Sequence, residues 1–261
     1  MTKVLATYNI KGGVGKTSAA VNLGYLAARD GFQTLLWDLD PQGASTYLFR
    51  IKPKVRGGTR KLVGLKREVA SVIKGTDHEG LDLLPADFSY RHMDLALDRF
   101  KRPTRRLGRV LDPIREEYDF VFLDCPPSIS LVSESVFEAA DALLVPIIPA
   151  TLSSRTFDQL EELAEDRKDL EVFAFFSMVD TSRRLHRQVM ANVRDMHRVA
   201  MLGAAIPSSE EIEWMGVERT VVAEIAPGSL PALAYEALWL DIKRRLGRPE
   251  PARATTLRAR S

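Results

Sequence analysis

Residues 3–17, KVLATYNIKGGVGKT, join a strand pattern to a glycine-rich turn and the start of a helix. The first half is apolar and contains β-branched and aromatic residues, which predicts a buried strand. In the second half, Gly12, Gly13 and Gly15 allow successive backbone N–H groups to face a single point. A helix N-terminus also favours an anion, so the stretch predicts a phosphate-binding loop. The alternative is a surface turn rich in Gly and Lys, which the strand before it and the helix after it disfavour.

Side chains of this loop supply positive charge and a hydroxyl group. In phosphate loops of the pattern G-x-x-x-x-G-K-[ST], the lysine reaches the β- and γ-phosphates and the last residue ligates Mg²⁺. Lys16 and Thr17 occupy these two positions. The sequence departs from the pattern at its first glycine, where Ile10 stands, and it places a second lysine, Lys11, just inside the loop. Two lysines directed at one phosphate chain are difficult to explain by a surface turn.

These residues resemble the deviant Walker A box, K-G-G-x-G-K-[ST], of the ParA/MinD family of dimeric ATPases, in particular its short, Soj-like partitioning members. The resemblance implies a doubly wound α/β fold with a mostly parallel sheet and helices on both faces. It also implies ATP and Mg²⁺ as ligands, and a homodimer in which Lys11 crosses to the phosphates held by the partner subunit. The nucleotide-binding residues that it implies are Lys11, Gly12, Gly13, Val14, Gly15, Lys16, Thr17 and Ser18, together with Met178 and Pro207.

Carboxylates follow two further apolar runs. Residues 33–39 predict a strand that ends in the box D-x-D-P-Q-G, which contains Asp38 and Asp40. Residues 119–127, DFVFLDCPP, predict a buried strand that ends at Asp124. Such strand ends lie where parallel α/β folds bind ligands, although Asp-Pro-Gln-Gly alone is also an ordinary turn. Both boxes match the family, and Asp40 is the residue that would position the attacking water. The catalytic residues implied are Lys11, Lys16 and Asp40, and the Mg²⁺-holding residues are Thr17, Asp38 and Asp124.

Basic residues gather in the segment that follows the first carboxylate box. From residue 41 to residue 67 the sequence has no Asp or Glu. The basic residues are Arg50, Lys52, Lys54, Arg56, Arg60, Lys61, Lys66 and Arg67. This run predicts a basic loop insertion around residues 50–67 that does not pack tightly. It forms either a solvated face or a contact with nucleic-acid phosphate, and the sequence does not decide between the two.

Arg183, Arg184 and Arg187 follow a strand predicted over residues 171–178. In the family, the helix after this strand lies near the DNA-facing surface of the dimer. The resemblance therefore implies these arginines as candidates for contact with DNA phosphates, with a plain solvated helix as the alternative. Many partitioning relatives also place arginines after the Ile-Pro pair that stands here at residues 206–207, whereas this chain has glutamates, which would weaken phosphate binding. These are Glu210, Glu211 and Glu213.

Length and composition restrict the class of protein. A chain of 261 residues, 45% of them hydrophobic, suits one ATPase domain over residues 1–247 and a disordered tail, rich in Pro and Arg, over residues 248–261. Cys125 is the sole cysteine, which excludes internal disulfides and fits a reducing cytoplasm. No apolar run approaches the roughly 20 residues that span a bilayer, and the tail lacks an amphipathic stripe, so no membrane partner is expected.

The resemblance implies an ATPase that forms an ATP-sandwich dimer, binds DNA non-specifically and positions a chromosome, plasmid or protein cargo. Its hydrolysis is expected to be slow and stimulated by a ParB-like or adaptor protein, and its location cytoplasmic, with nucleoid association when ATP is bound. One alternative is a biosynthetic amidoligase of the cobyrinic acid or dethiobiotin synthetase kind, which shares this fold. The other is a MinD- or flagellar-type positioning ATPase that does not bind DNA.

Overall fold

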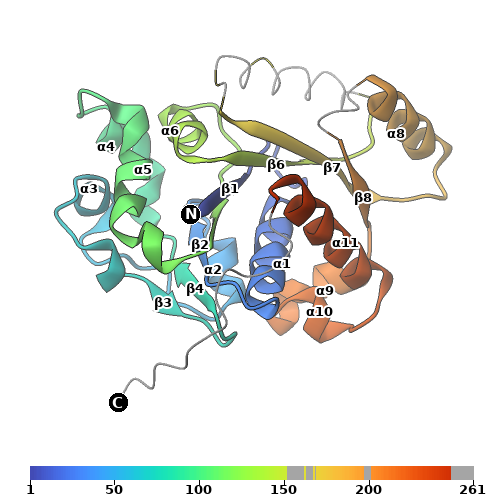
Figure 1. The fold of residues 1–261 in the computed structure, drawn as a ribbon, viewed down its shortest axis with the longest axis horizontal. Helices are drawn as coiled ribbons and strands as arrows, with labels where there is room; N and C mark the ends of the chain where they lie inside the picture. The colour runs from blue at the N-terminus through green and yellow to red at the C-terminus, as the bar shows by residue number, and fades with distance from the viewer. Residues whose placement is uncertain (152–161, 163–166, 168, 197–200, 248–261) are drawn as a thin grey trace.

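A central sheet organises the protein, for which the computed structural model describes residues 1–151, 162, 167, 169–196 and 201–247. Its strands are β1 (Lys3–Thr7), β2 (Thr34–Asp38), β3 (Lys74–Gly75), β4 (Leu81–Leu84), β5 (Phe120–Asp124), β6 (Ala142–Ile147), β7 (Glu171–Val179) and β8 (Met201–Pro207). The eight strands lie in the order β3-β4-β2-β5-β1-β6-β7-β8 (Figure 1). Neighbouring strands are parallel except for β3 and β4, which are antiparallel. The predicted fold class, a mostly parallel doubly wound sheet, is therefore confirmed.

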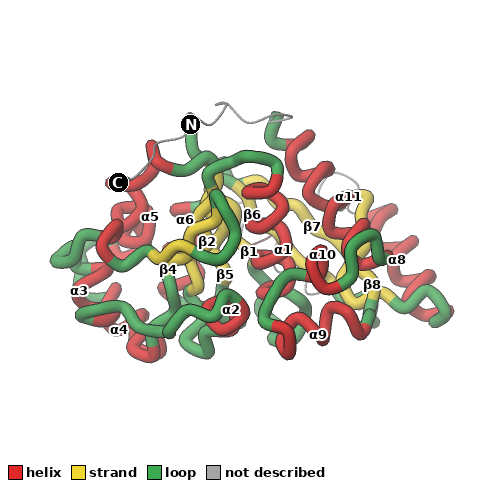
Figure 2. Tube along the Cα trace, turned by 90° about the horizontal axis from the view of Figure 1, so that it is seen from below, coloured by secondary structure: helices red, strands yellow, loops and turns green. Residues whose placement is uncertain are grey.

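Helices cover both faces of this sheet. Among the described residues they are α1 (Lys16–Arg29), α2 (Ala44–Leu48), α3 (Gly58–Val63), α4 (Met93–Leu97), α5 (Arg106–Leu111), α6 (Leu131–Ala139), α8 (Arg184–Met196), α9 (Glu210–Glu218), α10 (Val222–Ile225) and α11 (Leu230–Arg245). Short 3-10 helices cover Val69–Ser71, Phe88–His92, Pro103–Arg105 and Asp112–Glu117. Figure 2, like Figure 1, shows α3 and α4 at one end of the molecule and α8 at the other.

Side chains of β1 alternate between the two faces of the sheet. Val4 and Ala6 join the buried cluster that includes residues of α3, α5 and α6, whereas Leu5 joins the cluster that includes residues of α1 and α11. All three side chains are fully buried. Because helices cover both faces, the strand is apolar along its whole length instead of alternating with polar residues.

The segment 50–67 packs against the body of the protein, so the prediction of a loop that does not pack tightly is wrong. It contains α3, and Val55, Leu62 and Val63 are buried. Arg106 of α5 donates from Nε to the carbonyl of Val63 at 2.9 Å, which ties the end of α3 to the next helix. The basic side chains lie mostly at exposed positions between these apolar ones, so a count of charges conceals the packing.

The remaining predictions concern the C-terminal tail and membrane-spanning helices. The predicted tail, residues 248–261, lies outside the described residues, and the domain boundary at residue 247 stays a prediction. Within the ranges that the structure describes, no helix combines the length and the apolar character needed to cross a bilayer.

Candidate functional site

The carboxyl ends of β1, β2 and β5 lie side by side and bring the predicted loop and carboxylates together. In the register of the sheet, Thr7 at the end of β1 pairs with Asp124 at the end of β5. Asp38 at the end of β2 pairs with the same Asp124. The loop of residues 8–15 leaves β1 at this edge, so the glycines, the lysines and both carboxylates share one location.

Backbone geometry explains why the loop requires glycine. Gly13 and Gly15 have φ angles of 70° and 94°, in the left-handed region that favours glycine. A Cβ atom on Gly15 would also lie 2.7 Å from Ser177 Oγ, closer than real Cβ contacts. The start of the loop is fixed by Asn9, whose Nδ2 donates to the carbonyl of Pro146 and whose Oδ1 accepts from Lys11 N, each at 2.9 Å. The loop is therefore a shaped backbone cradle at the N-terminus of α1.

The two lysines of the loop have opposite environments. Lys16 is buried, with 7% of its surface exposed, and its Nζ donates to the carbonyl of Lys11 at 2.9 Å. Burial lowers the pKa of Lys16, while the charges of Asp124, Cys125 and Asp40 act in the opposite direction. Lys11 itself is exposed to solvent. One lysine thus lies inside the cradle, and the other is available at the surface of the same loop.

Asp38 and Asp124 form a buried carboxylate pair, with no exposed surface on either residue. Asp38 Oδ2 accepts from Thr46 N at 2.8 Å and from Thr46 Oγ1 at 2.7 Å. Asp124 Oδ2 accepts from Ser45 Oγ at 2.7 Å, and Thr17 also donates to this carboxylate. Burial is the main cause that raises the pKa of both carboxyls, and the charge of Asp124 raises that of Asp38 further.

One oxygen of this pair has no protein partner within the described part of the chain. Asp124 Oδ1 is buried and accepts no hydrogen bond there. Buried polar atoms are normally satisfied, and a carboxylate oxygen beside a threonine hydroxyl is a donor set that Mg²⁺ prefers. The residues present therefore fit a magnesium ion, which Asp124 and Thr17 would hold, with Asp38 beside them.

The sequence did not single out Ser45 and Thr46, which hold the two carboxylates. They lie in the first turn of α2, which begins at Ala44 directly after the D-x-D-P-Q-G box, and Gly43 before this helix has a φ of 67°. Two hydroxyl residues at the start of a helix that follows a carboxylate box are the signal that would have found them. Asp40 of the same box is only half-buried, and one of its oxygens accepts from Gln42 N at 2.9 Å.

Met178 and Pro207 lie near the ends of β7 and β8, where Val179 pairs with Pro207. The pairing is irregular at this point, and Met178 has a φ of 54° and an exposed fraction of 42%. Its neighbour Ser177 is the residue that approaches Gly15. The structure thus places Met178 next to the loop, and Pro207 one strand farther along the same edge.

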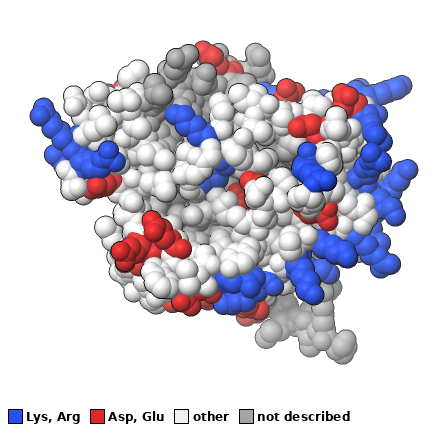
Figure 3. Space-filling model, turned by 180° about the vertical axis from the view of Figure 1, so that it is seen from behind, with Lys and Arg blue, Asp and Glu red and all other residues white. Residues whose placement is uncertain are grey.

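The three arginines named from the sequence differ in their contacts. Arg183 precedes α8, which begins at Arg184, and both residues are exposed. Arg187 is also exposed, but its Nη1 donates to the carbonyls of Thr181 and Ser182. Arg187 therefore holds its own turn, which leaves Arg183 and Arg184 as the more available pair. Figure 3 shows acidic and basic side chains gathered in separate groups on one face of the molecule.

Comparison with known proteins identifies the family of this chain. A family model described as an AAA domain matches residues 2–171, which include the loop and all the carboxylates described above. The chromosome partitioning protein ParA of Caulobacter vibrioides is 33% identical over 221 residues, which cover 80% of this chain and 82% of that protein. The chain belongs to the ParA/MinD family. The sporulation initiation inhibitor protein Soj of Bacillus subtilis is 30% identical over 214 residues, covering 79% of this chain and 85% of Soj.

This ParA/MinD protein is also similar to a solved structure that is not described as a partitioning protein. Cobyrinic acid a,c-diamide synthase from Mycobacterium smegmatis, with bound ADP and magnesium, superimposes with a TM-score of 0.80 and 27% identity. The match covers 98% of this chain and 100% of the synthase. A chromosome partitioning protein and a structure described as a synthase are thus both similar to this chain, so the likeness alone does not assign the activity.

Proposed function

We propose that this ParA/MinD protein binds Mg·ATP, dimerises around it and uses the ATP-bound dimer to hold a cargo on DNA. Slow hydrolysis of the γ-phosphate, stimulated by a ParB-like or adaptor protein, then releases the dimer. The observation that carries the proposal is the pair of lysines, of which Lys16 is buried inside the cradle and Lys11 is exposed on the same loop. Lys11 lies outside the cradle that holds Lys16, so its side chain is accessible to a partner subunit that approaches this edge of the sheet.

The chemical roles follow from the environment of each group. Bound Mg²⁺ would supply neutralisation of the charge that develops on the phosphates. Lys16 adds a fixed positive charge inside a desolvated cradle, where electrostatic interactions are strong. Asp40 is half-buried and its charge reaches Lys16, so it lies at the cradle and is partly open to water. We assign to Asp40 the orientation of the attacking water, and to Asp38 the support of the metal-binding oxygens.

The DNA-binding part of the proposal rests on Arg183 and Arg184. Both are exposed, and they stand at the start of α8, near the end of β7 that also carries Met178. Contacts of arginine with phosphates are independent of base sequence. The first turn of α9 carries Glu210, Glu211 and Glu213, which oppose these contacts, so we expect the DNA affinity to be modest and to require both subunits of the dimer.

The test is the binding of Asp40→Ala protein to random-sequence duplex DNA in ATP, in ADP and without nucleotide, across a salt series. Binding that requires ATP and falls steeply with salt supports the proposal, because counterion release from several phosphate contacts has this signature. Arg183→Gln/Arg184→Gln should reduce the salt slope, and Arg187→Gln should change it less. An ATP-bound dimer that ignores DNA at low salt would point to a MinD- or flagellar-type role on a protein surface.

A synthase is the second candidate, favoured by the 27% identity to the Mycobacterium smegmatis structure over nearly the whole chain. An enzyme of that kind phosphorylates a carboxylate, so a small carboxylic acid would accelerate phosphate release from ATP. Stimulation by such an acid in a phosphate-release assay, together with ATP turnover that ignores DNA, would replace the positioning role. Stimulation only by a protein partner would leave the positioning role in place.

A further inference from the structure

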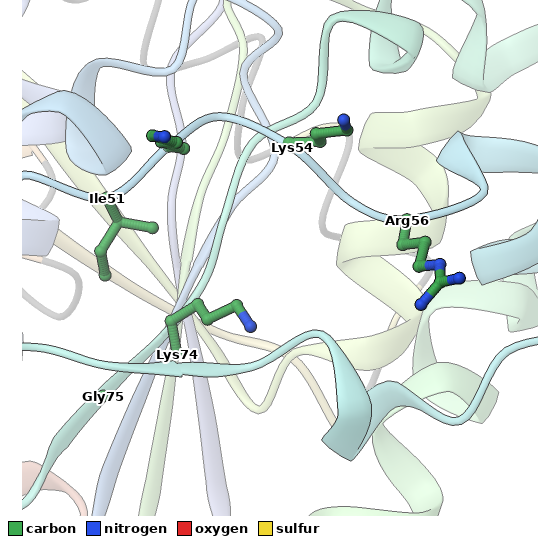
Figure 4. Close-up of a pocket in the computed structure, with 6 residues that line it drawn as sticks. Ile51, Lys54, Arg56, Lys74 and Gly75 are labelled. Carbon is green, nitrogen blue, oxygen red and sulfur yellow. The ribbon is translucent and has the colours of Figure 1, made fainter.

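A pocket lies between residues 51–56 and the edge strand β3, away from the phosphate loop. Its described lining residues are Ile51, Lys52, Lys54, Arg56, Lys74 and Gly75, and its volume is about 620 Å³. In Figure 4, Ile51 and Arg56 point down from the upper chain segment and Lys74 points from β3 into the space between, whereas the Lys54 side chain runs along the upper segment. A hollow of this size falls within the range of small-ligand sites.

The charge of the pocket has a single sign. Four of its lining residues are basic, and among the described lining residues none is acidic. None of these four forms an ion pair within the residues that the structure describes, although the charge of Lys54 also acts on the nearby Asp87 carboxylate. The adjacent Arg50 differs, because it pairs with Asp77 at 3.4 Å and donates to the carbonyl of Glu218. Like charges gathered around one hollow repel each other, and an anion between them relieves that repulsion.

The backbone that carries these cations is held in place. Val55 is buried, and its N–H donates to Asp87 Oδ2 at 2.7 Å. Ile51 N donates to the carbonyl of Thr46 at 3.1 Å, which fixes the other end of the segment to α2. The pocket walls are therefore preformed, so a ligand does not have to order the chain before it binds.

The position of the pocket separates it from both surfaces already described. β3 is an edge strand and lies four places from β1 in the sheet, a distance of about 19 Å at the usual spacing of strands. α8 lies between β7 and β8 in the chain, at the opposite edge of the sheet. The pocket is therefore distinct from the nucleotide cradle and from the arginines of α8.

We infer that this pocket is a second anion site that takes a small ligand with several phosphate groups. Lysine and arginine bind phosphate oxygens, and four of them around one hollow suit a compact, multiply charged ligand better than a single phosphate. Ile51 adds an apolar surface beside the cations. Duplex DNA presents its phosphates along an extended path that calls for a basic stripe, whereas this pocket is a single hollow.

The test uses the full chain with Lys16→Ala, which removes phosphate binding at the loop, and isothermal titration calorimetry with inorganic tripolyphosphate. We expect saturable binding of one tripolyphosphate per chain, weakened at least about tenfold by Arg56→Gln/Lys74→Gln, because two charge-assisted contacts are lost. The matched control is Arg99→Gln/Lys101→Gln, which removes the same charge from exposed positions outside the pocket and should retain the affinity.

A second titration distinguishes a nucleoside polyphosphate from an inorganic polyphosphate as the ligand. Adenosine tetraphosphate that binds more tightly than inorganic tetrapolyphosphate, which has the same number of phosphates, would assign a nucleoside polyphosphate, whereas equal affinity would assign the phosphates alone. The inference is overturned if tripolyphosphate shows no saturable binding, or if both double variants weaken it equally. It is also overturned if the pocket variant weakens duplex DNA binding while tripolyphosphate does not bind.

Discussion

The phosphate loop and the pocket beside β3 both present lysines, yet they are built in opposite ways. Lys16 is 7% exposed and anchored to a backbone carbonyl, on a loop whose glycines adopt conformations that other residues avoid. The four cations of the pocket are exposed side chains on two segments, residues 52–56 and the edge strand β3. The loop thus achieves phosphate recognition by burial and backbone shape, whereas the pocket relies on charge. Substitutions that alter the backbone should therefore impair the phosphate loop, whereas changes of ionic strength should alter ligand binding in the pocket.

The largest expected effect is that of Lys16→Ala on nucleotide binding. Removing a buried, desolvated charge should weaken ATP binding by about 3–5 kcal/mol, which is effectively a loss of binding. Calorimetric titration with Mg·ATP measures it, and Arg99→Gln, at an exposed position outside both sites, is the control that should retain affinity. Wild-type ATP affinity in Lys16→Ala would refute the assignment of the phosphate loop.

The next largest effect is the difference in folding stability between a Gly→Ala substitution in the phosphate loop and one in the pocket. Gly15→Ala should lower the free energy of unfolding by about 2–4 kcal/mol, since it adds a strained φ of 94° to a Cβ contact of 2.7 Å with Ser177 Oγ. Gly75→Ala in the pocket meets only an ordinary contact of 3.7 Å with Asp82 Oδ1 and should change stability by less than about 1 kcal/mol. Urea denaturation measures both. Equal losses would show that the loop is no more constrained than the pocket.

A third prediction concerns pH and the buried carboxylates. Burial raises the pKa of Asp38 and Asp124 above the ordinary carboxyl value of about 4, so the folded protein binds more protons than the unfolded chain above that pH. The stability of the metal-free protein should therefore be greatest at acidic pH and fall as the pH rises toward neutrality. Asp124→Asn should flatten this dependence, as measured by unfolding in EDTA between pH 4.5 and 8. A slope unchanged by Asp124→Asn would mean that other groups cause it.

The smallest effect is that of salt on the two sites. Raising sodium chloride from 50 to 200 mM should weaken tripolyphosphate binding in the pocket several-fold, because its cations are solvated and screened. Mg·ATP binding at the loop should change less, since Lys16 is buried. Paired calorimetric titrations at the two salt concentrations measure the difference. A steeper salt dependence at the loop would contradict the idea that the loop binds phosphate through a buried lysine and the pocket through exposed charges.

The sequence predicted the sheet and the phosphate loop because each depends on local patterns. A glycine-rich turn after an apolar strand, and carboxylates after two further strands, needed no knowledge of distant contacts. Ser177 could not be predicted as a neighbour of Gly15, because the two residues lie far apart in the chain and meet only through the order of β1, β6 and β7. Arg187 could not be separated from Arg183 either, since its hydrogen bonds depend on the shape of its turn.

The error over residues 50–67 has a different cause. Charge density suggested a segment that does not pack, but three buried apolar residues, two of them in α3, anchor it to the body of the protein. Val55, Leu62 and Val63 perform this role, and the charges around them remain in solvent. The same arrangement creates the pocket, because an anchored backbone holds its exposed cations close together.

The most direct test of the account is the oligomeric state of Asp40→Ala protein in ATP and in ADP, measured by light scattering after size-exclusion chromatography, with and without Lys11→Ala. We expect a dimer in ATP, a monomer in ADP, and a monomer in both nucleotides once Lys11 is removed, with ATP still bound. A Lys11→Ala protein that dimerises in ATP as well as its parent would show that the exposed lysine does not reach a partner subunit.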